Sequence, residues 1–326
     1  MAPAAQPTGS RMLCVELCRS YISHAHRVYR RPDGTPTRTP ANIEIALRPI
    51  LTCYADVSAE RFHSSHLRAI RASWVDAGLT RTTINDRSRV IVAMFTWAAE
   101  LGYVADSVVA HLRVVRPLRR GMAAEGRGVI PVSAGVVAAT LVCMPPAIAD
   151  MCRFMMLTGA RVGEAREARS DELHVVEQPS LSLWVLRPRW HKTARHGCSR
   201  SLVLNREAQR FIQSRLGRTY LFGPDEGDRP YHPAAVTVAI YRACDRAGVK
   251  RWSPGQIRHT VATTVYERLG LDSARLLLGH TTTRVTHRYI HSHDEGACAE
   301  IVGVLSCSQI SMEASSDEPG CEARAG

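Results

Sequence analysis

Lysine is nearly absent from this chain of 326 residues. Lys192 and Lys250 are the only two, so the other 40 of its 42 basic side chains are arginines. The 30 acidic residues leave a formal net charge of +12, a balance that is typical of proteins that bind polyanions. Nucleic acid is therefore the first partner that we expect. Because arginine is used wherever a positive charge is sufficient, each lysine needs an explanation of its own.

The sequence also lacks long apolar runs and paired cysteines. No segment approaches the roughly 18 consecutive apolar residues of a membrane-spanning helix. The first ten residues are small and polar, unlike a secretion signal, in which a charged region precedes an apolar one. The ten cysteines contain no CxxC pair, so we expect reduced thiols that mostly pack in the interior. These absences predict a cytoplasmic protein that has no contact with a membrane.

The length favours two domains, and 45% hydrophobic residues are enough to fill two cores. Apolar residues recur at helical spacing through residues 11–112, which predicts an all-α domain. The clearest helix is Thr82–Leu101, which ends before Gly102 and has the apolar stripe Ile84, Ile91, Met94, Phe95, Ala98 and Leu101. Further helices are expected at Arg11–Tyr29, Asn42–Tyr54 and Ser65–Ala77.

The segments that flank this domain are predicted to be irregular. Residues 113–130 are rich in arginine and glycine and have little apolar periodicity, as in a flexible basic linker. Four of its arginines are candidate DNA-binding residues, namely Arg113, Arg116, Arg119 and Arg120. We expect disorder in residues 1–10 and in the acidic tail, residues 308–326.

Residues 131–307 predict a second domain that is mostly α with a small β-sheet, an α+β fold. Its first clear helix carries Met151, Met155 and Met156 on a buried stripe and ends at Thr158-Gly159. Strand-like runs at Leu181–Leu186 and Ser201–Leu204 flank a basic tip that contains Lys192, which predicts a hairpin. Helices are also expected at Gln256–Leu269, which Gly270 ends, and at Ser273–Leu278, Thr286–His291 and Glu295–Leu305.

Five short motifs follow one another in this second domain. They are Thr158-Gly159-Ala160-Arg161-Val162-Gly163-Glu164, Lys192, Arg258-His259-Thr260, Leu278-Gly279-His280 and, nine residues after His280, Tyr289. This order resembles the tyrosine recombinase, or phage integrase, family. The family has a TGxRxxE box, a lysine on a β-hairpin, an HxxR box, an LGH box and a nucleophilic tyrosine. The resemblance covers roughly residues 131–291, and the helical first domain looks like the core-binding domain of the family.

The resemblance implies site-specific integration or excision of DNA through a 3′-phosphotyrosine intermediate. The covalent intermediate stores the energy of the broken bond, so neither ATP nor a metal nor another cofactor is implied. It further implies two domains that clamp double-stranded DNA and a homo-tetramer assembled on paired sites. A protein of this kind is expected in a bacterium, in the cytoplasm and associated with the nucleoid.

The residue types of the motifs suit this chemistry. Breaking a phosphodiester without a metal needs donors that neutralise charge on the non-bridging oxygens, and the guanidiniums of Arg161 and Arg258 are rigid forks that do so. Glu164, three residues after Arg161, lies on the same helical face and is expected to orient Arg161 or a neighbouring ligand, unless it is a simple surface pair. Tyr289 is the nucleophile that the resemblance implies.

Two more residues are candidates for proton transfer. Lys192 is expected to protonate the departing 5′ oxygen, which arginine cannot do because its pKa is above about 12. His280 is expected to bind the scissile phosphate or to assist the proton transfer. Lys250 is interpreted as an ordinary phosphate or surface contact.

One position departs from the family pattern. The HxxR box has a histidine three residues before its arginine, whereas this chain has Gly255 three residues before Arg258. Glycine has no side chain that could transfer a proton, so the departure concerns the catalytic rate more than the fold. His259 lies about 100° around the helix from Arg258, and packing is a better interpretation for it than catalysis.

Two other hypotheses stay open. Gly255 favours a catalytically weak or inert sequence-specific DNA-binding protein on a recombinase scaffold. The shared chemistry also allows a type IB topoisomerase-like enzyme that relaxes supercoils. His287, His291 and His293 are close in sequence, but none of the spacings is a zinc signature, so we expect no metal.

Overall fold

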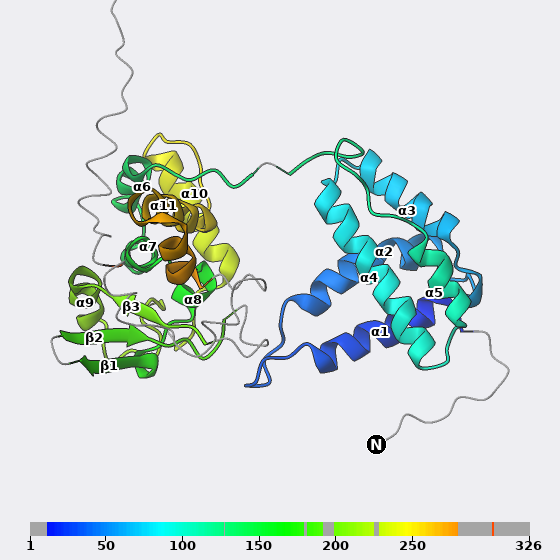
Figure 1. The fold of residues 1–326 in the computed structure, drawn as a ribbon, viewed down its shortest axis with the longest axis horizontal. Coiled ribbons are helices and arrows are strands. Elements are labelled where there is room, and N and C mark those ends of the chain that lie inside the picture. Colours follow the sequence, from blue (N-terminus) through cyan, green and yellow to red (C-terminus); the bar gives the residue numbers. More distant parts are fainter. Residues whose placement is uncertain are drawn as a thin grey trace, which may run out of the picture. The chain divides into compact units, whose positions relative to one another are not determined.

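The computed structural model describes residues 12–126, 128–178, 181–191, 199–224, 228–279 and 302. The chain forms two compact units, residues 1–128 and 129–326 (Figure 1). Each unit has its own hydrophobic core, so each is described by itself. The first is helical and the second is mostly helical with one small sheet, which confirms the predicted fold class.

The first unit is a bundle of helices around its longest helix. Its elements are α1 (Cys14–Val28), α2 (Thr39–Cys53), the 3-10 turn η1 (Ala59–Arg61), α3 (Ser64–Asp76), α4 (Arg81–Glu100) and α5 (Asp106–Arg113). Helix α4 packs against the other four helices, and its predicted stripe from Ile84 to Ala98 is buried. The prediction was wrong for Leu101, which is 44% exposed because it follows the end of α4.

Local sequence signals set the ends of these helices. The Thr80 hydroxyl accepts a hydrogen bond from the backbone N–H of Thr83 and so caps the start of α4. Gly78 and Gly102 follow α3 and α4 with φ of +71°, a backbone conformation that glycine adopts without strain. The prediction missed α5, because eight residues give only a short pattern, yet this helix buries Val108, Val109 and Leu112.

The first part of the predicted linker is docked on the helical unit. The Asn85 side chain donates to the backbone oxygen of Leu118 at 3.1 Å and accepts from the backbone N–H of Leu118 at 2.8 Å. Arg81 donates to both carboxylate oxygens of Glu125, at 2.6 and 3.1 Å. The linker was expected to be flexible, but these contacts hold Leu118 and Glu125 against α4.

The second unit contains a three-stranded antiparallel sheet in the order β1-β2-β3. Its strands are β1 (Leu173–Gln178), β2 (Leu181–Leu186) and β3 (Leu202–Leu204). The hairpin of β2 and β3 was predicted, and Trp184 pairs with Leu204 in it. Strand β1 was missed because it lies at an edge of the sheet and exposes Val175, so it has no buried alternation to detect.

The helices of the second unit surround a buried central helix. They are α6 (Ala134–Leu141), α7 (Pro146–Thr158), α8 (Val162–Arg166), the 3-10 turn η2 (Ser170–Glu172), α9 (Arg206–Gln213), α10 (Pro233–Arg246) and α11 (Pro254–Leu278). Helix α7 contacts α8, α9, α11 and β3. Met151, Met155 and Met156 are buried in it, so their interpretation as core residues is confirmed.

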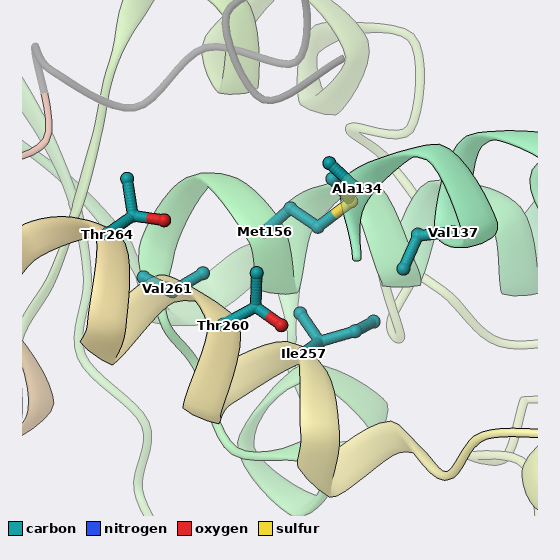
Figure 2. A pocket seen from close by; sticks show the side chains of 7 residues that line it. All are labelled: Ala134, Val137, Met156, Ile257, Thr260, Val261 and Thr264. Atoms are coloured by element: carbon teal, nitrogen blue, oxygen red, sulfur yellow. The ribbon is translucent and has the colours of Figure 1, made fainter. Parts of the chain in front are cut away.

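Helix α11 consists of two helical pieces. Gly270 has φ of +82° and ψ of 179°, which is not helical, so the two predicted helices on either side of Gly270 are confirmed. The first piece packs on α6 and α7 (Figure 2). The gap of about 10 Å³ between Val137, Met156 and Ile257 is apolar and no larger than a water molecule, so it is a packing defect rather than a binding site.

Several expectations fall outside the described residues. They are the expected disorder of residues 1–10 and 308–326, the helix Thr286–His291, the helix Glu295–Leu305 apart from Val302, and the cysteines Cys198, Cys298, Cys307 and Cys321. The described cysteines are free thiols. Burial raises the pKa of Cys14, Cys18 and Cys152 to about 12. In the part of the chain that the structure describes, no helix has the length and apolar character to cross a membrane.

Candidate active site

The turn between α7 and α8 positions Arg161. Gly159 ends α7 in the left-handed conformation with φ of +64°, and Arg161 is the N-cap of α8. A Cβ on Gly159 would lie 3.4 Å from both Val261 and Leu278, so glycine at this position also lets α11 pack closely against the turn. The TGxR sequence thus places Arg161 beside the two pieces of α11.

Glu164 lies beneath Arg161 and is buried. Its carboxylate accepts from the backbone N–H of Arg161 at 3.0 Å and from the Arg161 guanidinium at 2.7 Å. Burial raises the pKa of Glu164, but the charge of Arg200 and the hydrogen bonds from Arg161 outweigh it and leave the pKa below its usual value. Glu164 therefore carries a negative charge at neutral pH, and it binds both the backbone and the side chain of Arg161.

Arg258 reaches the same place from the start of α11. Its guanidinium donates to the backbone oxygen of Gly159 at 2.6 Å and to the backbone oxygen of Leu278. Burial and the nearby charges of Arg161 and Arg200 lower the pKa of Arg258 to about 9. Arg258 still carries its proton at neutral pH, in surroundings that disfavour a further positive charge.

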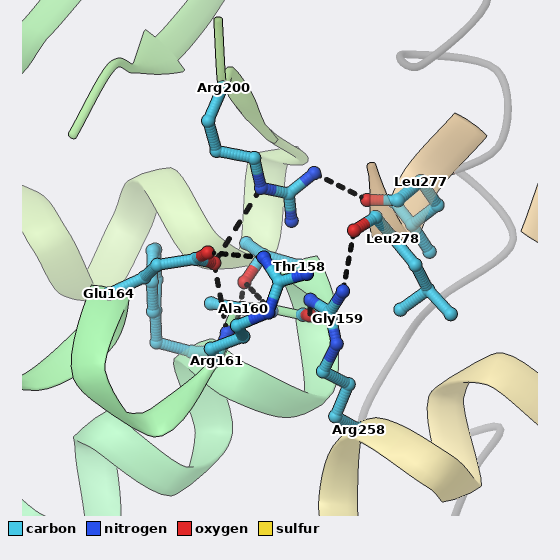
Figure 3. Close-up of polar contacts among 10 residues, drawn as sticks. Thr158, Gly159, Ala160, Arg161, Glu164, Arg200, Arg258, Leu277 and Leu278 are labelled. Carbon is cyan, nitrogen blue, oxygen red and sulfur yellow. Dashed lines mark hydrogen bonds and ion pairs between the residues drawn. The ribbon is translucent and has the colours of Figure 1, made fainter. Parts of the chain in front are cut away.

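Arg200 is a third guanidinium at this site, and the sequence analysis did not predict it. It precedes β3, donates to the backbone oxygen of Leu277 at 2.7 Å, and lies with its Nε 3.6 Å from the Glu164 carboxylate (Figure 3). In a chain with 40 arginines no motif marked it. The only available signal was its place at the end of the basic hairpin tip, two residues before Leu202, where a run of buried apolar side chains begins.

Arg161, Arg200, Arg258 and Glu164 form what we call the arginine cluster. Figure 3 shows that its side chains converge from the α7–α8 turn, the start of β3 and α11. Together the four side chains carry a net charge of +2, and the Arg161 side chain is 23% exposed. One buried guanidinium beside two partly exposed ones can donate hydrogen bonds to a phosphate or another oxyanion.

Gly255 lies in the first turn of α11, at the position where the family has histidine. Its φ is not positive, and a Cβ added to it would meet no described atom within 4 Å. Gln256 donates to the backbone oxygen of Ile130 at 2.9 Å and accepts from the backbone N–H of Ser253, so it is engaged away from the cluster. His259 is exposed, so it is not the packing residue that the sequence suggested.

The remaining predicted site residues lie outside the described part of the chain. They are Lys192, His280 and Tyr289. The structure therefore brings together Arg161, Glu164 and Arg258, and their relation to the other three stays a prediction. His287, His291 and His293 also lie outside, and the described residues contain no group of three His, Cys, Asp or Glu side chains that could hold a metal ion.

The four candidate DNA-binding arginines are exposed at the end of the helical unit. Arg113 is the last residue of α5, and the other three, Arg116, Arg119 and Arg120, follow it. Arg113 also lines a pocket of about 210 Å³ together with Arg71 and Arg89. Arg71 is buried there and donates to the backbone oxygen of Arg116 at 2.8 Å, so this part of the unit concentrates positive charge.

Several solved structures share the fold of this chain, although their sequences are distant from it. None of the curated proteins matches the sequence. Among solved structures, a lambda integrase dimer bound to a COC′ core site has a TM-score of 0.59 at 17% identity and covers 83% of this chain and 96% of its own. The Tn1549 transposon integrase in complex with circular intermediate DNA has a TM-score of 0.58 at 16% identity and covers 89% and 99%.

A third similar structure is a lambda integrase tetramer bound to a Holliday junction, with a TM-score of 0.58 at 17% identity and coverage of 85% and 78%. At these identities the likeness shows a shared fold. The model of the phage integrase family matches residues 140–295, a range that includes the whole arginine cluster. The chain therefore contains a domain that matches the phage integrase family, and it shares its fold with the lambda and Tn1549 integrases.

Proposed function

We propose that this protein is a site-specific recombinase that cleaves and rejoins double-stranded DNA through a 3′-phosphotyrosine intermediate. The observation that carries the proposal is the convergence of Arg161 and Arg258. They come from motifs far apart in the sequence, yet Arg258 binds the backbone oxygen of Gly159, two residues before Arg161. Both guanidiniums belong to one oxyanion site, which is what a phosphoryl transfer without a metal requires.

The charge of the cluster matches the reaction. A phosphodiester carries one negative charge, and a second develops on its non-bridging oxygens as the nucleophile attacks. The net charge of +2 on the cluster therefore fits the transition state better than the ground state, and only this difference accelerates the reaction. Burial and the charges of Arg161 and Arg200 lower the pKa of Arg258, so its positive charge is electrostatically unfavourable, and a phosphate bound beside it would offset this cost.

The other roles in this proposal follow the family motifs. The Tyr289 hydroxyl loses its proton to solvent as its oxygen bonds to phosphorus, and the bond from phosphorus to the 5′ oxygen breaks. Lys192 gives a proton to that oxygen, and His280 donates a hydrogen bond to the phosphate. In the rejoining step a 5′ hydroxyl attacks the phosphotyrosine, and the same groups act in reverse.

DNA is the proposed partner of both units. The exposed Arg113, Arg116, Arg119 and Arg120 are proposed phosphate contacts, and the two integrase structures that resemble this chain are described as DNA complexes. Recombination exchanges strands between two sites, so we propose a homo-tetramer on DNA, the form described for the lambda integrase structure on a Holliday junction.

A suicide substrate tests the proposal. It is a duplex from the ends of the protein's own genetic element, nicked so that the fragment bearing the 5′ hydroxyl diffuses away after cleavage. The wild-type chain is expected to form a covalent adduct that survives denaturation, and Tyr289→Phe is expected to form none while it binds the duplex with similar affinity. Adducts in Tyr289→Phe would contradict the assignment of the nucleophile.

A second candidate function is DNA binding without catalytic activity, which the absence of the family histidine at Gly255 favours. The same experiment separates the two, since binding of the duplex by the wild-type chain without any adduct is the outcome that such a protein gives. A topoisomerase-like enzyme would form adducts but relax supercoiled DNA that carries a single site, whereas a recombinase yields joined products only from paired sites.

A further inference from the structure

We propose that Arg200 is a positioning residue for this cleavage reaction, one that holds Glu164 and the C-terminal end of α11 in place from inside the protein. The inference rests on the proposed function and assigns a role to a residue that lies outside the five family motifs. Arg200 would act through its neighbours rather than by contact with DNA.

Burial is the first observation that supports this role. The Arg200 side chain is 3% exposed, whereas the Arg161 side chain is 23% exposed. Arg200 therefore has almost no surface to offer a DNA strand. A buried ion pair also adds little net stability compared with well-packed apolar side chains of similar size, so the stability of the fold alone does not explain an arginine at this position.

The contacts of Arg200 join two parts of the site. Its Nε lies 3.6 Å from the Oε2 atom of Glu164, the carboxylate that binds the backbone and the guanidinium of Arg161. One of its terminal nitrogens donates to the backbone oxygen of Leu277 at 2.7 Å. Figure 3 shows Arg200 between these two acceptors. A single rigid fork therefore sets the distance between the α7–α8 turn and the end of α11.

The same guanidinium limits the space beside Gly279. A Cβ on Gly279 would lie 3.1 Å from a terminal nitrogen of Arg200 and 3.5 Å from its Cδ. Gly279 ends α11 with φ of +59°, so glycine is favoured there by its backbone conformation as well. Gly279 packs directly on Arg200, and a displaced guanidinium would displace Gly279.

Loss of Arg200 would change the site in two ways. Glu164 would keep Arg161 as a partner but lose the charge that contributes most to lowering its pKa. The backbone oxygen of Leu277 would lose a buried donor. Misplacement of catalytic groups by about 1 Å costs up to 100-fold in rate, so we expect a 10- to 100-fold slower cleavage step.

Single-turnover cleavage of the suicide substrate tests this role, with Arg200→Met and Arg200→Lys compared with wild type. The rate constant measures the chemistry of folded complexes, and the amplitude measures how many complexes are active. We expect both variants to lose 10- to 100-fold in the rate constant, to keep most of the amplitude, and to bind the duplex within about threefold of wild type. Lysine is not expected to restore the rate, because one ammonium cannot reproduce the fork.

The matched control is Arg215→Met. The Arg215 side chain is also largely buried, at 12% exposed, and pairs with Asp150 in the same unit, but it lies outside the arginine cluster. It is expected to alter the melting temperature without altering the rate constant. If the Arg200 variants behave in the same way, with a lower melting temperature or amplitude and an unchanged rate constant, Arg200 is merely structural and the inference is wrong.

Two glycine variants test the same role without a change to Arg200 itself. Gly279→Ala adds one methyl group against the Arg200 guanidinium, whereas Gly248→Ala has the same backbone cost at φ of +66° and meets no described atom within 4 Å. We expect only Gly279→Ala to lower the rate constant. Equal rate constants for the two variants would overturn the inference even if the Arg200 variants do not fold.

The proposed function and this inference fail in different ways. If the wild-type chain forms no adduct, the proposed function is wrong. If the wild-type chain forms adducts and the Arg200 variants keep its rate constant, the inference alone is wrong. A substrate with sulfur at the 5′ bridging position needs no leaving-group proton, so the Arg200 variants should stay slow on it if Arg200 positions the arginine cluster rather than the general acid. Full rescue by sulfur would contradict that.

Discussion

Arg258 donates a hydrogen bond of 2.6 Å to the backbone oxygen of Gly159, a residue 99 positions earlier in the chain. The bond joins the two arginine motifs through the backbone. The Arg161 side chain, which is bound to Glu164 and 23% exposed, can meet a ligand from the surface, while two backbone oxygens hold Arg258 in place. An oxyanion that enters the cluster would therefore find its donors already arranged.

The first prediction concerns oxyanion binding in the absence of DNA. The pKa of Arg258 is lowered to about 9, so the unfolded chain binds more protons than the folded one between about pH 9 and the higher pKa of an ordinary arginine. The free energy of unfolding should therefore rise with pH through that range. Below about pH 9 Arg258 is charged in the folded protein, so the full cost of burying its charge is present. At pH 7 an anion that binds the cluster offsets this cost.

Sulfate should thus raise the melting temperature of wild type more than chloride does at equal ionic strength. Arg258→Met should lose most of the sulfate-specific increase. Sulfate also stabilises proteins in general, so Arg251→Met, which removes an exposed arginine paired with Asp245, serves as the control and should respond like wild type. Equal responses of all three proteins would contradict an oxyanion site at the cluster.

The second prediction concerns Glu164. Its pKa is lower in the folded protein than the usual 4.5, so its contribution to stability is present above about pH 4.5 and is lost as the pH falls through its folded value. Glu164→Gln leaves Arg161 and Arg200 without this carboxylate, and removing one partner of a buried pair costs about 3–5 kcal/mol. Denaturant titrations should show this loss at pH 7 and a smaller difference near pH 3. A difference that does not depend on pH would mean that the charge of Glu164 is not what stabilises the site.

The third prediction concerns Gly255. Its φ is not positive and a Cβ there would meet no described atom within 4 Å, so the backbone accepts a side chain. Gly255→Ala should fold and keep the wild-type rate of adduct formation. Gly255→His restores the family histidine and should increase that rate by about 10-fold or more, since single acid–base groups contribute roughly 10²–10⁴-fold. If histidine gives no gain over alanine, another group already transfers the proton.

The fourth prediction concerns salt. If Arg113, Arg116, Arg119 and Arg120 neutralise phosphates, replacing all four with alanine should make the slope of log affinity against log salt shallower by about 3–4 units. Arg251→Ala should leave the slope unchanged, because Arg251 is paired with Asp245. A slope that is the same in wild type and the fourfold variant would exclude these arginines as phosphate contacts.

The fifth prediction concerns Lys192. In Lys192→Arg the new side chain keeps the positive charge but cannot give up a proton. Cleavage of normal DNA should therefore be strongly impaired. A substrate with sulfur in place of the 5′ bridging oxygen should restore the rate of this variant, because the sulfur leaves without a proton. Persistent impairment on that substrate would mean that Lys192 only positions the phosphate.

The sequence predicted the fold where its patterns are strong. Apolar residues recur at helical spacing in α4 and α7, and a glycine follows each of them. The structure has helices at both places. Strand β1 was missed because it lies at a sheet edge and buries too little to alternate. Docking of the segment near Leu118 was missed because it depends on the tertiary contact with Asn85.

The candidate site shows the same division. Arg161 and Arg258 could be found because motifs mark them, and Glu164 because its spacing places it on the face of Arg161. Arg200 could not be found, since its importance lies in a distance of 3.6 Å to Glu164 and a bond to Leu277 that no local pattern encodes.

The break at Gly270 has a consequence for how the second unit tolerates changes in length. Arg258 binds the backbone oxygen of Leu278, although both residues belong to α11. In a straight helix they would be about 30 Å apart, at 1.5 Å per residue, so the bond exists only because the chain turns back at Gly270. An inserted residue on either side of this turn would rotate one piece by about 100° and shift the register of the pair, whereas residues added at the turn itself would extend a loop and leave the register intact.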